Sequence, residues 1–176
     1  MKKSNLFSVT VFLLLLVHCI DPAKKKPVKA DAVTIEQRLK MASKNYLKAW
    51  SDQDSNLLQA TAIRNTVRNV NGKIVSSNRS GLSETMEFWH TAMPDFKIVE
   101  REIIVVENRT YTNWTCTGTN TGMLGDNPPT GKKSITEGFS ILTFDDQGKL
   151  VHETAYFDVM GTMEDWGYSM VAPIME

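Results

Sequence analysis

The stretch GKLVHETAYFDVMG, residues 148–161, alternates apolar and polar side chains, which predicts a β-strand over residues 149–159. A turn signal, DDQG, stands directly before it. Similar alternating segments precede this strand and are separated from one another by further turn signals. They cover residues 96–107, 109–119 and 132–144. The second part of the chain is therefore predicted to form a long antiparallel meander.

The sequence pattern in the first part of the domain predicts mostly helix. Apolar side chains recur every three or four residues over 32–50, which indicates an amphipathic helix, and a short helical segment follows near Leu57. Residues 63–75 predict a β-hairpin around the turn dipeptide Asn71-Gly72, and residues 80–92 a further helix. Helices followed by a meander define an α+β fold, whose curved sheet can enclose an apolar pocket.

The N-terminus has the features of an export signal. Lys2 and Lys3 precede an apolar run over residues 6–17, which is shorter than the roughly 20 residues of a membrane-spanning helix. Residues 16–19, LVHC, resemble a bacterial lipobox, although His18 replaces the usual small residue. We expect a signal peptide over 1–18, a lipidated Cys19, a tether over 19–31 and one domain over 32–176, at the periplasmic or outer surface of a bacterial membrane. Simple secretion is the alternative.

Charge and composition exclude several classes of partner. The chain without residues 1–18 carries 18 basic and 20 acidic residues, a formal charge of 18 − 20 = −2, so nucleic acid is not an expected partner. The three histidines are dispersed, and no cluster has the spacing of metal ligands. We expect neither a metal nor another cofactor. Cys116, in a predicted strand, is interpreted as a structural residue.

Three segments together resemble the SnoaL-like polyketide cyclases, which belong to the nuclear transport factor 2-like superfamily. They are FWHTAMPDFKI at 88–98, TGTNTGMLGDNPPTGKK at 117–133 and GKLVHETAYFDVMGTMEDWG at 148–167. The resemblance covers about residues 35–167. It implies a cone in which a curved antiparallel sheet wraps around N-terminal helices, and it implies a homodimer formed through the sheet. This scaffold supports hydrolysis, isomerisation, cyclisation and plain binding, so the site must decide the function.

The resemblance also locates the expected catalytic groups. An aspartate on the last strand of the cyclases acts as general acid/base, and an ungapped match places it on Ala155 and the preceding histidine on Glu153. A second histidine is expected within 138–142, where the only polar side chain is Ser140. Asn120 stands where many relatives have histidine. These departures argue against the cyclase reaction itself.

Other residues remain candidates for the site. Glu153, Ala155 and Phe157 share one face of the predicted strand, so Glu153 either serves as a base in the cavity or lies at its rim, solvated or paired with a lysine. His90 is a candidate for the cavity or a packing residue. The expected ligand-binding residues are His90, Trp89, Trp114, Ser140, Ala155 and Phe157.

Three functions stay open. The first is an exported, lipid-anchored domain that binds an unidentified small hydrophobic or aromatic molecule without the cyclase aspartate. The second is a lyase, isomerase or hydrolase in which Glu153 is the base. The third is a non-catalytic dimeric interaction module whose cavity is filled by its own side chains.

Overall fold

The first helix of the computed structural model, which describes residues 34–169 and 171, begins at a capping box. The Thr34 hydroxyl accepts a hydrogen bond from the backbone N–H of Gln37, and the Gln37 side chain accepts one from the N–H of Thr34. The elements follow in this order: α1 Ile35–Asp52, α2 Ser55–Thr61, β1 Ala62–Val70, β2 Lys73–Ser76, α3 Arg79–Ala92, β3 Lys97–Val106, β4 Arg109–Thr119, β5 Lys133–Phe144, β6 Leu150–Phe157 and α4 Val159–Asp165.

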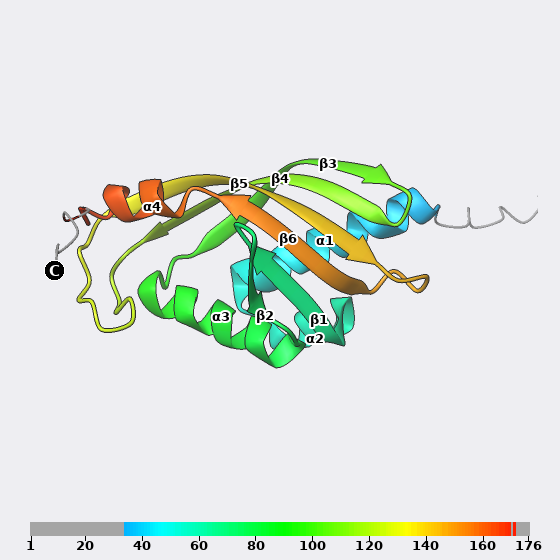
Figure 1. The fold of residues 1–176 in the computed structure, drawn as a ribbon, viewed down its shortest axis with the longest axis horizontal. Coiled ribbons are helices and arrows are strands. Elements are labelled where there is room, and N and C mark those ends of the chain that lie inside the picture. The colour runs from blue at the N-terminus through cyan, green and yellow to red at the C-terminus, as the bar shows by residue number, and fades with distance from the viewer. Residues whose placement is uncertain (1–33, 170, 172–176) are drawn as a thin grey trace, which may run out of the picture. The chain divides into compact units, whose positions relative to one another are not determined.

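The six strands form one sheet in the order β2-β1-β6-β5-β4-β3. The predicted meander is confirmed, because β3, β4, β5 and β6 pair antiparallel in sequence order. The hairpin adds to the same sheet, and β1 pairs with β6 in parallel. The sheet curves over α1 and α3 (Figure 1), which confirms the expected α+β cone.

The hairpin between β1 and β2 turns at the predicted dipeptide. Asn71 and Gly72 both have positive φ angles, 48° and 82°, which is the backbone that a two-residue turn of this kind requires. The Asn71 side chain also bonds the backbone N–H and C=O of Phe157. The turn is therefore joined to the end of β6, next to which β1 lies.

The last helix starts earlier than the sequence pattern suggests. The sequence predicts that Asp158 fixes the turn after the last strand and that Thr162 and Asp165 form the cap pair of a final helical turn. The cap-pair prediction is wrong. Asp158 is the N-cap, because its carboxylate accepts a hydrogen bond from the N–H of Gly161. Thr162 instead lies inside α4 and exchanges a 2.6 Å hydrogen bond with Thr136 of β5.

The hydrophobic core lies between the concave face of the sheet and the helices. Its largest fully buried apolar side chains come from α1, α2, α3, β5, β6 and the end of α4. They are Trp166, Tyr46, Phe144, Leu39, Leu58, Leu82, Met86, Leu142 and Leu150. Each buried side chain of this size contributes about 1.5–3 kcal/mol of transfer free energy, so the core accounts for most of the stability of the domain.

The expected signal peptide, tether and Cys19 lie outside the described residues, and the start of the domain at residue 32 stays a prediction. Within residues 34–169, no helix combines the length and the apolar character needed to cross a membrane.

Candidate functional site

Side chains from α1, β1 and β5 meet at the carboxylate of Glu153 on β6. Its Oε2 accepts a 2.5 Å hydrogen bond from the hydroxyl of Tyr46 and a 2.8 Å bond from Nε of Arg68. Its Oε1 accepts a 2.9 Å bond from the hydroxyl of Ser140, which itself accepts a 3.0 Å bond from Nε1 of Trp114. Glu153 is only 3% exposed. The interpretation that it lies solvated at a rim is wrong, because the carboxylate is buried and accepts three hydrogen bonds from the protein.

Arg68 is the charge partner of Glu153. The two residues face each other in the parallel register between β1 and β6, and their side chains are 8% and 4% exposed. The guanidinium carbon of Arg68 lies 4.3 Å from the centroid of the Trp50 ring, which adds a cation–π contact. The lysine that was considered as a partner is therefore replaced by an arginine, whose planar group suits a buried ion pair.

Tyr46 remains a neutral hydrogen-bond donor in this network. Burial of its ring, followed by the negative charge of Glu153, raises the pKa of the Tyr46 hydroxyl well above its ordinary value of 10. A neutral phenol can donate only one proton, and that proton points at the Glu153 carboxylate. The hydroxyl thus helps to hold the carboxylate in one orientation.

A narrow, mostly apolar cavity lies beside the ion pair. Its empty space is about 560 Å³, including its opening. Its aromatic lining consists of Trp50, Trp89, Phe96, Trp114 and Phe157, and its polar lining of Arg68, Glu153, Ser134, Thr136 and Thr162. A slot with aromatic walls and a few grouped polar atoms is typical of a site for a flat organic molecule.

The predicted ligand-binding residues divide into two groups. Trp89, Trp114 and Phe157 line the cavity, together with Glu153. Ser140 and Ala155 are fully buried and are not part of the lining. Ser140 can influence the cavity only through Glu153 and Trp114, to which it is bonded.

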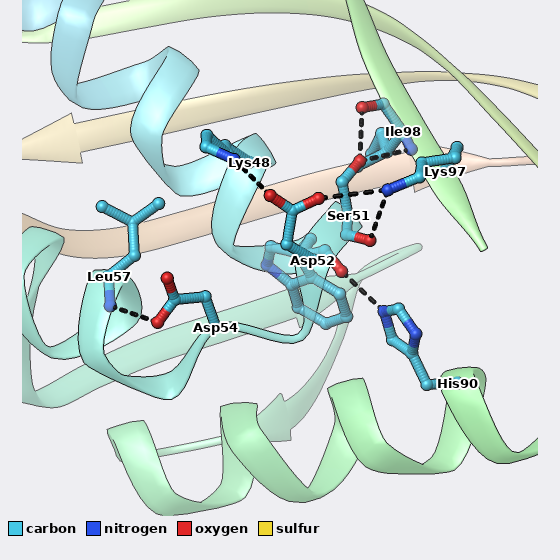
Figure 2. Close-up of polar contacts among 9 residues, drawn as sticks. Lys48, Ser51, Asp52, Asp54, Leu57, His90, Lys97 and Ile98 are labelled. Atoms are coloured by element: carbon cyan, nitrogen blue, oxygen red, sulfur yellow. Dashed lines mark hydrogen bonds and ion pairs between the residues drawn. The ribbon is translucent and has the colours of Figure 1, made fainter. Parts of the chain in front are cut away.

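His90 does not reach the cavity lining. Its Nε2 lies 2.8 Å from the backbone carbonyl of Trp50, and its ring centroid lies 5.0 Å from that of Phe96. Figure 2 shows the His90 side chain reaching from α3 toward the end of α1. Because a carbonyl oxygen only accepts, Nε2 carries a proton and donates it. His90 therefore joins α3 to the end of α1 and does not meet Glu153 in a shared space.

The end of α1 is also fixed to strand β3. The Ser51 hydroxyl donates to the backbone carbonyl of Ile98 and accepts from its N–H, both at 2.8 Å (Figure 2). Since β3 is an edge strand, this side chain satisfies backbone groups that no neighbouring strand would pair. Ile98 lines the cavity, so the contact also holds one of its walls in place.

The environments of Cys116 and Asn120 indicate that both residues have structural roles. Burial raises the pKa of the Cys116 thiol to about 12, so the thiol stays protonated at neutral pH although its residue lines the cavity. The fully buried Asn120 side chain donates to the carbonyls of Ala92 and Gly122 and accepts from Thr130. Asn120 thus ties the loop after β4 to the end of α3.

Arg68 is the residue that the sequence analysis missed. Thr66, Arg68 and Val70 share one face of β1 by strand alternation, and Thr66 and Arg68 are both buried. A charged residue in the inward register of a predicted strand was the available signal. Its partner is 85 residues away along the chain, so the sequence alone could not identify it.

The curved sheet, the helices beneath it and the enclosed cavity define a domain of the nuclear transport factor 2-like class. Residues 40–166 match the family described as SnoaL-like polyketide cyclase. The chain therefore belongs to the SnoaL-like polyketide cyclase family. A comparison with curated proteins gives no match.

Solved structures agree with this fold at low sequence identity. IdmH from Streptomyces antibioticus is 16% identical with a TM-score of 0.65, over 74% of this chain and 99% of its own. AclR from Streptomyces galilaeus is 23% identical with a TM-score of 0.67, over 80% and 87%. A SnoaL-like protein from Jannaschia sp. CCS1 is 14% identical with a TM-score of 0.70, over 80% and 99%.

Proposed function

We propose that this domain binds one small, flat and mostly apolar organic molecule in the cavity beneath its sheet, without the aspartate chemistry of the cyclases. The observation that carries the proposal is the aromatic lining of the cavity beside a buried charged pair whose two members neutralise each other. Ala155, where the resemblance places the aspartate, has no group that can transfer a proton. Membership of the family supports this proposal, because its fold suggests a domain of the cyclase or isomerase type that binds a small molecule.

The contacts of Glu153 favour binding over proton abstraction. A general base must have a free lone pair within hydrogen-bond reach of the substrate. Oε2 accepts from both Tyr46 and Arg68, and Oε1 accepts from Ser140, so three of the roughly four acceptor sites of the carboxylate are used within the protein. The carboxylate is thus used as the centre of an internal network, and this supports a positioning role for Glu153.

Blocking the cavity tests the proposed function. We expect an aromatic fragment to raise the melting temperature of the natural protein saturably; at 100 times its Kd the gain is about 2.7 kcal/mol. Ile98→Trp, which adds volume to the cavity wall, should lower the affinity for that fragment by tenfold or more. Ile74→Trp, on the exposed strand β2, is the matched control and should bind normally. Equal binding by both variants, or a fragment screen without any saturable shift, would contradict the proposal.

We further propose that the domain is exported and held at a bacterial membrane by a lipid on Cys19. The support is the N-terminal sequence alone: two lysines, an apolar run and the segment LVHC. Cys19→Ser should release the protein into the soluble fraction and change its mobility on a gel. A variant that still sediments with membranes and migrates unchanged would exclude the lipid.

A homodimer formed through the sheet is part of the same proposal. The exposed face of the sheet carries the apolar side chains Val99, Ile104, Ile135 and Tyr156, each about half exposed or more in the single chain. A second copy that covered this face would remove them from water. Sedimentation velocity should therefore report a dimer, and a monomer at all concentrations would exclude it.

A further inference from the structure

Arg68 has hydrogen-bond donors that the protein does not use. A guanidinium carries five N–H groups. In the described part of the chain, the only side-chain hydrogen bond of Arg68 runs from Nε to Glu153. Its two terminal nitrogens have no such bond, although the residue is only 7% exposed and lines the cavity. These nitrogens are not among the side-chain atoms that are fully buried without a partner, and Arg68 lines the cavity, so a molecule in the cavity can accept hydrogen bonds from them.

Two contacts fix the orientation of the Arg68 guanidinium at the cavity wall. Glu153 fixes Nε, and the Trp50 ring lies against the plane of the group at 4.3 Å from its carbon. The indole N–H of Trp50 has almost no accessible surface and lies near the Tyr46 hydroxyl, so it is not open to the cavity. Arg68 therefore supplies this wall of the cavity with donors suited to an acceptor atom.

The charge balance decides which acceptor fits. Among the described residues that line the cavity, only Arg68 and Glu153 are charged, and they neutralise each other. A carboxylate placed on Arg68 would lie close to the Glu153 carboxylate and be repelled by it. Resting on the proposed function, we infer that Arg68 determines ligand specificity by donating to one uncharged oxygen, such as a ketone or ester oxygen, of an otherwise apolar flat molecule.

Three probes of similar size test the inference in the natural protein: 1-tetralone, tetralin and 1-naphthoate. Quenching of the fluorescence of the cavity tryptophans measures the binding of each probe. We expect 1-tetralone to bind about tenfold more tightly than tetralin, as one hydrogen bond from a charged donor would give. 1-Naphthoate should bind more weakly than 1-tetralone. The carbonyl stretch of bound 1-tetralone should move to lower frequency in the infrared spectrum.

The double variant Arg68→Met/Glu153→Gln removes the donors without leaving a buried charge unpaired. We expect the affinity ratio of 1-tetralone to tetralin to fall from about ten to about one, and the infrared shift to disappear. Arg101→Met/Glu137→Gln, made at two exposed positions, should keep both the ratio and the shift.

The outcomes separate the two proposals. Equal binding of 1-tetralone and tetralin to the natural protein, or a preference that survives in the Arg68→Met/Glu153→Gln variant, would overturn the inference and leave the binding function standing. Tighter binding of 1-naphthoate would overturn the preference for an uncharged acceptor. Failure of all three probes to bind would overturn the proposed function and this inference together.

Discussion

Glu153→Gln is expected to lower the free energy of unfolding by about 3–5 kcal/mol, which is the usual effect of removing one partner from a buried ion pair. The substitution keeps the shape of the side chain, so packing is not the cause. It leaves the charge of Arg68 buried without a counter-charge, at a position where the side chain is 8% exposed. Guanidinium chloride denaturation followed by circular dichroism measures the change.

A control and a rescue make this result specific. Glu137→Gln, at an exposed position of β5, should change the free energy of unfolding by no more than about 0.5 kcal/mol. Arg68→Met added to Glu153→Gln should recover most of the lost stability, because the orphaned charge is then absent. If Glu153→Gln is as stable as the natural protein, the pair is not held in the buried geometry described above.

Trp166→Ala is expected to cost about 3–5 kcal/mol, the range for removing a large aromatic side chain from a packed core. Trp166 is 0% exposed, and its ring centroid lies 6.3 Å from that of Trp89. It also ends α4, the helix from which Thr162 reaches the cavity lining. The variant should therefore lose ligand affinity as well as stability, as thermal unfolding with and without ligand would show.

Met160→Ala is the matched control for this second prediction. Met160 lies on the same helix but is 46% exposed, so its removal should leave stability within about 0.5 kcal/mol of the natural value. A Trp166→Ala variant with unchanged stability would mean that α4 does not dock through this side chain.

Local patterns predicted most of the fold. Alternation located all four strands of the meander within two residues of their ends, and the dipeptide Asn71-Gly72 identified the hairpin. Alternation also placed Glu153 and Ala155 on one buried face. These predictions succeed because each depends on neighbours a few residues apart.

The site was less predictable because its contacts are distant in sequence. The parallel pairing of β1 with β6 brings Arg68 to Glu153, and no turn signal in the sequence indicates that these two strands pair. His90 faces a carbonyl at the end of α1, a partner that no side-chain pattern encodes. Asp158 was correctly assigned to the turn after β6, but its capping role was given to residues further along.

The separation of the network in sequence has a kinetic consequence. Arg68 and Tyr46 are 85 and 107 residues from Glu153, so the folding chain must close two long loops before these groups meet. We therefore expect both charges to stay hydrated while local helices and hairpins form, and to lose their water together when β6 docks. Contacts that form this late are absent from the folding transition state, so removing them lowers the barrier to unfolding. Substitutions in the pair should therefore accelerate unfolding far more than they slow folding.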